Sequence, residues 1–180
     1  MVIEVHPPQA SGSRFSILFV EPRFAGLYAK QRYHYLAHLI PSKYAEEHLP
    51  DCVWIELAPG ERPEDVVHPD EELISSIKSD VMKYLCGVGF FEALDDAYCP
   101  ADATRIREVC TGDFRCSKAI LASCGVPESD FFDVFHVLMS EGGFCDCEIL
   151  RNASAPSRLQ AEYWRARAQN HQPYNAHTGS

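Results

Sequence analysis

The sequence Gly-Gly-Phe-Cys-Asp-Cys at residues 142–147 is the most distinctive stretch of this chain, and Cys-Thr-Gly-Asp-Phe-Arg-Cys at residues 110–116 precedes it. Six of the eight cysteines fall between Cys99 and Cys147, and only Cys52 and Cys86 lie earlier. Thiolates gathered by a turn are a common way for a small intracellular domain to hold a metal ion. The clustering therefore predicts a metal site in the second half of the chain.

A structural zinc site takes four tetrahedral ligands, usually as two close pairs from separate segments. Cys145 and Cys147 form one pair, and Cys110 with Cys116 forms the other. Residues 117–144 read as a helical hairpin, which can bring its two ends together. The double glycine before the second pair suits a chain that turns its amides toward sulfur, since glycine adopts left-handed conformations freely. We therefore expect these four cysteines to bind zinc, with iron as the less favoured metal.

The other thiols receive different interpretations. Cys99 is the first substitute should one of the four ligands fail, and His136 is the first nitrogen donor. Cys52, Cys86 and Cys124 lie in apolar surroundings and are interpreted as core residues, because free cysteine often behaves as a small hydrophobe.

The cysteine motifs resemble a bacterial family, domain of unknown function 2695 (DUF2695). That family has a cysteine, then Leu-Arg and a hydroxyl residue at matching spacing, and a terminal Cys-Asp-Cys-Glu with a following Asn. Here the matching stretches are Cys110 to Ser117 and residues 142–152, and the resemblance covers roughly residues 105–153. It implies a site and not an activity. Many relatives carry His where this chain has Cys116, and because both bind zinc, the resemblance favours a ligand role there.

The first half of the chain predicts a small sheet. Residues 15–20 and 52–57 read as strands, with helices expected at 28–39 and 41–49 between them. A strand–helix–strand order is the pattern of a crossover unit, so the two strands should be parallel neighbours. Later elements are expected as helices at 73–85, 90–98, 117–124, 129–141 and 156–168, and a short strand at 147–150.

The fold class that follows is α+β: a small, mostly parallel sheet with helices, then a helical, metal-clasped subdomain. We expect an α/β part at residues 1–98, a cysteine-rich helical metal-binding part at 99–169, and a flexible tail at 170–180.

Charge and hydropathy exclude several classes of protein. The formal charge of 16 − 26 = −10 repels phosphate backbones, which argues against a nucleic-acid partner. The N-terminus lacks the basic and apolar regions of a signal peptide, and no apolar stretch approaches the ~20 residues that span a bilayer. We expect a cytoplasmic protein without a membrane partner, whose thiols stay reduced.

The function expected is that of a zinc-stabilised binding or accessory protein, with another protein or a small molecule as partner. The alternative is a small metalloenzyme with zinc or iron at the cysteines and an open coordination position, where Glu148 or Asp146 would act as base. A further alternative uses Cys145 or Cys147 as a nucleophile beside His136, but a metal-bound thiolate is a poor free nucleophile.

His34 and His38 share one face of a helix, as in helical metal sites. Tyr35 stands where a metalloprotease has its glutamate. We interpret these rings as a packed or interfacial aromatic face, and a small-molecule pocket is the alternative.

Overall fold

The computed structural model describes residues 1–7, 14–40, 52–98 and 110–154. These residues form two compact units, which divide between His68 and Pro69. The expected helices at 41–49 and 156–168, the tail at 170–180 and Cys99 lie outside the described residues.

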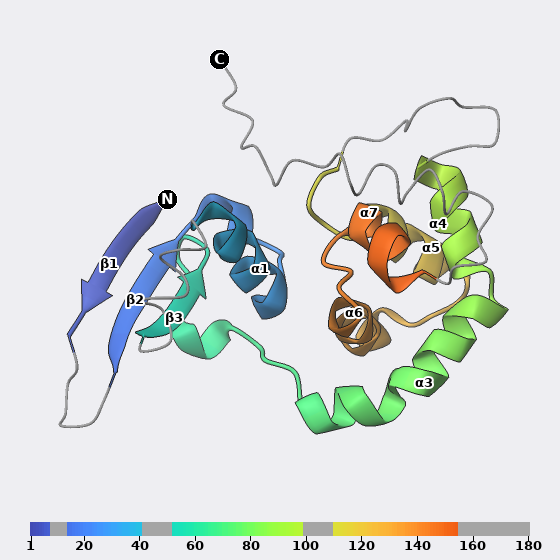
Figure 1. Cartoon of the computed structure of the whole chain (residues 1–180), viewed down its shortest axis with the longest axis horizontal. Coiled ribbons are helices and arrows are strands. Elements are labelled where there is room, and N and C mark those ends of the chain that lie inside the picture. The colour runs from blue at the N-terminus through green and yellow to red at the C-terminus, as the bar shows by residue number, and fades with distance from the viewer. Residues whose placement is uncertain (8–13, 41–51, 99–109, 155–180) are drawn as a thin grey trace, which may run out of the picture. The chain divides into compact units, whose positions relative to one another are not determined.

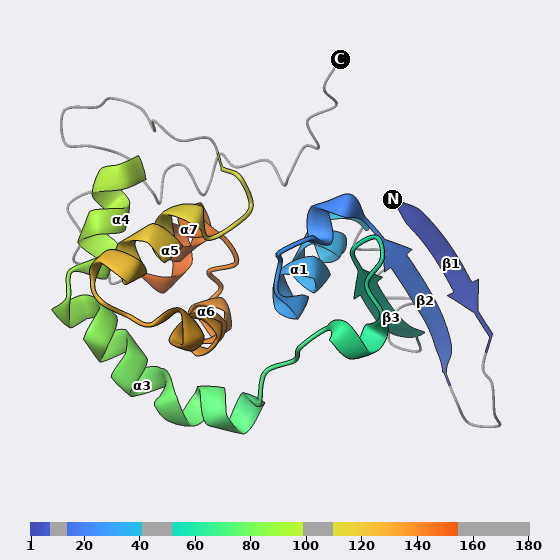
Figure 2. The ribbon, with the colours of Figure 1, turned by 180° about the vertical axis from the view of Figure 1, so that it is seen from behind.

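The first unit contains a three-stranded sheet in the order β1 (Val2–His6), β2 (Phe15–Val20) and β3 (Cys52–Leu57), as Figures 1 and 2 show. β2 and β3 are parallel, with Phe15 opposite Cys52 and Val20 opposite Leu57. Helix α1 (Ala29–Leu39) lies between them in the chain. Both predicted strands, their parallel pairing and the helix between them are confirmed.

The expectation of a mostly parallel sheet is wrong, because β1 pairs with β2 in antiparallel orientation, from Val2 opposite Val20 to His6 opposite Ser16. A short connection between adjacent strands favours this orientation, since a parallel pair needs a crossover of about a dozen residues or more. No strand was expected before residue 15. The β-branched Val-Ile-Glu-Val at residues 2–5 was the signal that could have revealed it.

Helix α1 packs on one face of the sheet and closes a small core. Phe19, Phe24, Leu36 and Ala58 are buried in this core. The ring of Trp54 packs against it, with its centroid 5.4 Å from that of Phe19. Tyr35 of α1 also packs against this core, which agrees with the interpretation of a packed aromatic face.

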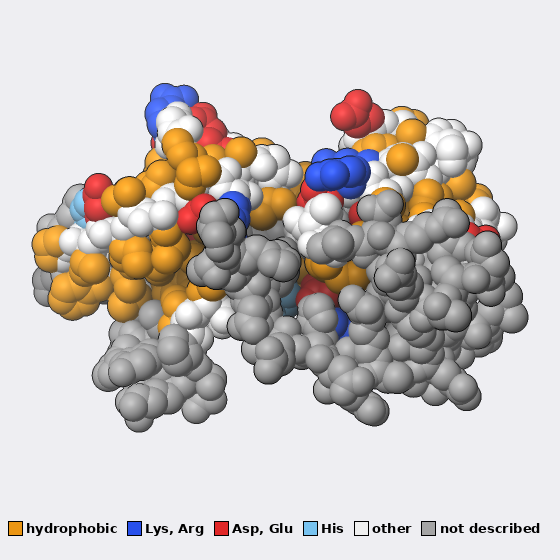
Figure 3. Space-filling view, turned by 90° about the horizontal axis from the view of Figure 1, so that it is seen from above, with side chains coloured by type: hydrophobic (Ala, Val, Ile, Leu, Met, Phe, Trp, Pro, Cys, Tyr) orange, Lys and Arg blue, Asp and Glu red, His pale blue; other side chains and the backbone are white. Residues whose placement is uncertain are grey.

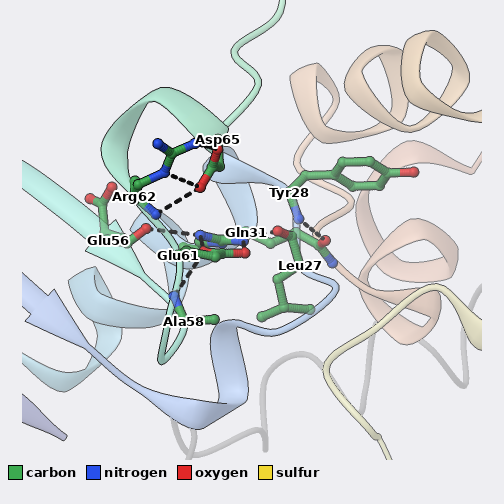
Figure 4. Close-up of polar contacts among 9 residues, drawn as sticks. Leu27, Tyr28, Gln31, Glu56, Ala58, Glu61, Arg62 and Asp65 are labelled. Atoms are coloured by element: carbon green, nitrogen blue, oxygen red, sulfur yellow. Dashed lines mark hydrogen bonds and ion pairs between the residues drawn. The ribbon is translucent and has the colours of Figure 1, made fainter.

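A buried arginine joins α1 to the loop that follows β3, and Figure 4 labels three of its partners, Leu27, Glu56 and Glu61. Arg32 is only 5% exposed, and its guanidinium donates to both carboxylate oxygens of Glu61, at 2.6 and 3.0 Å. It also donates to the carbonyl oxygens of Leu27 and Glu56, at 3.0 and 2.9 Å. Hydrogen bonding from Arg32 is the main reason that the pKa of Glu61 lies below its ordinary value. This ion pair is structural, because every partner belongs to the same small unit.

Several apolar side chains of the sheet are exposed, and hydrophobic atoms gather over it at the left of Figure 3. All five residues of β1 are exposed, and the apolar residues near half exposure or above include Ile3, Val5, Phe15 and Val53. β1 is therefore the least packed of the three strands.

The second unit is helical. Helices α3 (Glu71–Gly87), α4 (Phe90–Tyr98), α5 (Arg115–Ser123) and α6 (Phe131–Ser140) confirm four of the expected helices, with ends shifted by a few residues. Asp70 begins α3 by accepting hydrogen bonds from the backbone N–H groups of Glu72 and Leu73, at 3.0 and 3.1 Å. Gly125 follows α5 with φ +79°, the left-handed conformation that commonly ends a helix.

The expected strand at 147–150 is wrong, because these residues are helical. α7 (Asp146–Glu148) continues directly into a π-helix (Ile149–Ala153). The N–H of Ile149 donates to the carbonyl of Cys145 at 2.9 Å, and the N–H of Ser154 donates to that of Ile149 at 3.0 Å. The apolar pair Ile149-Leu150 is too short for periodicity to separate a strand from a buried helical turn, and both side chains are buried.

The helices of this unit pack around one core. α3 packs on α6 and α4 packs on α5. The ring of Phe114, just before α5, stacks on Phe135 of α6 with centroids 4.3 Å apart. An ion pair between Lys78 and Glu141 joins α3 to the end of α6. α3 and α4 therefore belong to the same compact unit as α5 and α6, and this unit begins at Pro69. The division expected at residues 98–99 stays a prediction. Among the described residues, no helix is both long and apolar enough to cross a membrane.

Candidate metal centre

Three cysteine thiols meet at one point of the helical unit. The Sγ atom of Cys147 lies 3.1 Å from that of Cys110 and 3.3 Å from that of Cys145, and Cys110 and Cys145 are 3.7 Å apart. In the described part of the chain, they form the one group of at least three His, Cys, Asp or Glu residues able to hold a metal ion. Cys145 is buried, while Cys110 and Cys147 are half-buried.

The thiols come from two short segments that secondary structure holds in place. Cys110 lies in the loop before α5, Cys145 is the N-cap residue of α7, and Cys147 lies within α7. The backbone N–H of Asp146 donates to the carbonyl of Asp113 at 3.0 Å, which joins the two segments directly. The sequence motifs therefore meet through main-chain contact as well as through sulfur.

The environment keeps the thiols of Cys145 and Cys147 protonated in the absence of a cation. Hydrogen bonding with Cys110 is the main reason that the pKa of Cys145 is raised well above the ordinary value of a thiol, and burial adds to it. Hydrogen bonding with Cys110 likewise raises the pKa of Cys147 to about 12. A metal ion at this point must displace protons, because the thiolate is the form that binds metal.

Asp146, between two of the thiols, caps helix α5 from outside. Its Oδ2 accepts the N–H of Cys116 at 2.8 Å, and its Oδ1 accepts the N–H of Ser117 at 3.0 Å and the Ser117 hydroxyl at 2.5 Å. The side chain is 1% exposed, and burial is the main cause of its raised pKa, which these hydrogen bonds counteract. Asp113 accepts the remaining free N–H of this turn, that of Arg115, at 3.1 Å. The first turn of α5 is therefore fully capped by two aspartates.

The double glycine makes the turn that delivers the Cys-Asp-Cys segment. Gly142 has φ +81°, which bears out the expected left-handed conformation, and its carbonyl accepts the side-chain amide of Asn152 at 2.7 Å. Gly143 is needed for a different reason. A Cβ atom there would lie 2.8 Å from Cγ1 of Ile149 and 3.2 Å from the carbonyl oxygen of Leu138.

Cys116 does not belong to the group of three thiols, although its backbone is bonded to Asp146. It lies half-buried in the first turn of α5. The structure thus brings together Cys110, Cys145 and Cys147 of the four expected ligands. A ligand role for Cys116 stays a prediction.

The remaining candidates lie apart from this group. His136 is buried in α6, and its Nδ1 lies 2.7 Å from the carbonyl oxygen of Phe132, so this nitrogen is the protonated one. Cys86 is exposed, so its interpretation as a core residue is wrong, whereas Cys52 and Cys124 are half-buried. The buried residues of helix α3 are Ile74 and Leu85, and Cys86 is not among them.

His34 and His38 do face each other, with ring centroids 4.2 Å apart. The Nδ1 of His38 lies 2.8 Å from the carbonyl oxygen of His34. Among the described residues, no third His, Cys, Asp or Glu joins them in a group able to hold a metal ion. On a neighbouring part of the same helix, the exposed ring of Tyr33 packs against Trp54 with centroids 5.2 Å apart, which agrees with a packed aromatic face.

Sequence reasoning missed three residues that shape the site. Tyr98 is buried, and desolvation, followed by the charges of Asp146 and the nearby thiols, raises the pKa of its hydroxyl. The hydroxyl of Ser117 donates to Asp146, and the side-chain amide of Asn152 donates to the carbonyl of Gly142. The signal for the last two was their fixed place in the family motif, where a hydroxyl residue and an Asn accompany the cysteines.

These features define a class of protein: a helical domain that clusters thiols between a capped helix and a glycine turn. The family model described as "Protein of unknown function (DUF2695)" matches residues 98–152, so the resemblance is confirmed for this segment. The match covers less than a third of the 180-residue chain. No curated protein and no solved structure matches the chain.

Proposed function

We propose that this protein is a zinc-stabilised binding or accessory module of the cytoplasm, in which the metal holds the cysteine-bearing segment together. The observation that supports this is the convergence of three thiols from segments 35 residues apart. Sulfur donors favour zinc, copper(I) and iron over magnesium or calcium. The seven described cysteines are free thiols, so none of the proposed ligands is engaged in a disulfide.

The spacing of the sulfurs suits a tetrahedral metal. Four sulfurs at about 2.3 Å from zinc lie about 3.8 Å from one another. The observed separations of 3.1, 3.3 and 3.7 Å require the group to open by less than about 1 Å to admit the ion. Because the loop of Cys110 is not helical, it can supply this movement.

Cys116 is our candidate for the fourth ligand. Its N–H is bonded to Asp146, the residue between two of the clustered thiols, so its backbone lies beside the site. A change of side-chain rotamer alters the position of a sulfur without moving the backbone. This would close the coordination shell with protein atoms, as in structural zinc sites.

The metalloenzyme alternative is favoured by one observation, namely that the clustered thiols number three, which would leave a position for water. The two bases that it would use have other partners. Asp146 accepts three hydrogen bonds from the start of α5. Glu148 accepts the N–H of Phe144 at 3.2 Å and pairs with Arg151 at 3.1 Å. The structural role therefore accounts for more of the contacts than catalysis does.

Metal analysis tests this proposal directly. Protein purified without chelator should contain about one zinc per chain, and the cobalt-substituted form should show the absorption spectrum of a tetrahedral thiolate site. Cys145→Ser should lose the metal, whereas Cys86→Ser, at an exposed thiol of α3, should keep it. Absence of any transition metal from the wild-type protein would overturn the proposal.

Chelation provides a second test. Because the thiols lie in the second half of the chain, removing the metal should expose residues ~100–153 to proteolysis before the first half. Uniform digestion of the whole chain would contradict a metal role confined to the cysteine-bearing segment.

A further inference from the structure

We propose that Cys110 and Cys147 form an oxidative modification site, where a hydroperoxide joins them in a disulfide and thereby releases the bound metal. This inference rests on the proposed metal site and adds its regulation by peroxide. The inference is drawn from the arrangement of the three thiols, which differ in their distances from one another and in their exposure.

The pair Cys110–Cys147 is the closest of the three, at 3.1 Å between sulfurs. A disulfide has an S–S bond of about 2.05 Å, so the two atoms must approach by about 1 Å. Cys110 lies in a loop outside any helix, close to Gly112 with φ +74°, and can move that far without breaking a helix.

The competing pair, Cys145–Cys147, is only slightly wider at 3.3 Å, but closing it would strain the residue between its members. Both the backbone and the side chain of Asp146 are hydrogen-bonded. Its N–H donates to the carbonyl of Asp113, and its carboxylate caps α5. A ring closed across this residue would have to displace it from these partners.

Exposure selects the same pair. Cys110 and Cys147 are half-buried, while Cys145 is 5% exposed. A small oxidant such as hydrogen peroxide therefore reaches Cys110 and Cys147 more readily than Cys145. Oxidation of cysteine follows thiolate character and exposure. Binding to a metal deprotonates the thiol, and the sulfur attacks peroxide once its bond to the metal opens.

The reaction balances with peroxide as the oxidant. The thiolate of one cysteine attacks a peroxide oxygen, which gives a sulfenic acid and releases hydroxide. The second thiolate attacks that sulfur, forms the S–S bond and releases a second hydroxide. Two electrons pass from the two sulfurs to one hydrogen peroxide, and two protons convert the hydroxides to water. The metal loses two thiolate ligands and dissociates.

The test uses the full-length, zinc-loaded Cys86→Ser protein, which removes an exposed thiol that could oxidise on its own. One equivalent of hydrogen peroxide is added, zinc release is followed with a coloured chelator, and disulfides are mapped by mass spectrometry after alkylation. We expect one zinc released per Cys110–Cys147 disulfide formed, and recovery of binding after reduction. Zinc retained after peroxide, or a disulfide at Cys145–Cys147 instead, would overturn the inference.

Two variants keep the test independent of metal loading. Cys145→Ser retains the proposed pair and should still form the Cys110–Cys147 disulfide in metal-free protein. Cys147→Ser leaves Cys145 as the clustered thiol beside Cys110, and we expect no disulfide at Cys110 in this variant. If wild-type protein contains no zinc, the proposed function fails, but the mapping in metal-free protein still decides the site. Equal disulfide yields from the two variants would contradict the proposal that Cys147 is the partner of Cys110.

Discussion

Replacing Gly143 by alanine tests the turn that delivers the Cys-Asp-Cys segment. The new Cβ would meet Cγ1 of Ile149 at 2.8 Å, the Cα of Ile149 at 3.1 Å and the carbonyl oxygen of Leu138 at 3.2 Å. Two of these three atoms belong to the backbone and cannot rotate away. Overpacking of this kind costs about 1–3 kcal/mol. The lower entropy of the unfolded alanine chain returns about 0.4–1 kcal/mol, so we expect a net loss of about 1–2 kcal/mol.

Gly87→Ala is the matched control, because a Cβ at this last residue of α3 meets nothing within 4 Å and the glycine has no positive φ. It should leave stability unchanged or raise it by up to about 1 kcal/mol. The assay is urea unfolding of the full chain, followed by far-ultraviolet circular dichroism. If Gly143→Ala is as stable as the wild type, the close approach of Ile149 is not what requires glycine, and the reasoning is refuted.

Three further substitutions test other contacts. Cys116→His should keep zinc while Cys116→Ala binds it more weakly; if Cys116→Ala behaves like wild type and Cys116→His unfolds, Cys116 is a core thiol and no ligand. Asp146→Asn opposes an amide to a backbone N–H and should cost about 2 kcal/mol in urea unfolding, against about 1 kcal/mol for Ser117→Ala; equal losses would contradict the capping role. Glu61→Gln should weaken the first unit only at higher pH. The pKa of Glu61 lies below its ordinary value of 4.5 in the folded protein, so its pairing with Arg32 stabilises above that pH and is lost as pH falls through the lower folded value. The stabilities of wild type and variant should therefore begin to converge below pH 4.5 and become equal below the lower folded pKa. A constant gap between them would argue against the ion pair.

The elements predicted from the sequence were those with a strong local signal. The β-branched run at 15–20 and the apolar helical face of residues 73–85 each carry a clear period, and both elements are present. β1 was missed because Val2-Ile-Glu-Val is short. Its side chains remain exposed, so the sequence carries no pattern of alternating buried and exposed residues there. The helical turn at 147–150 was mistaken for a strand because its conformation depends on tertiary contacts of Ile149 and Leu150 with the helical core.

In the candidate site, too, features marked by nearby residues were predicted, and those that depend on distant residues were not. Cys110, Cys145 and Cys147 were identified by residue type and spacing, and they do converge. The role of Asp146 could not be read from spacing, because its partners are backbone amides 29 and 30 residues away in the chain. Amides have no sequence signature, so only the folded arrangement reveals that this acidic residue is a helix cap.

The aspartate cap has a consequence for any attempt to graft or redesign this motif. The single residue between Cys145 and Cys147 is set by the helix it caps, not only by the sulfurs on either side. Widening the motif to the common two-residue knuckle would keep both thiols but carry the carboxylate away from the amides of α5. A host scaffold must therefore receive the Cys-Asp-Cys turn together with the start of α5, because the hydrogen bonds of Asp146 join the two segments.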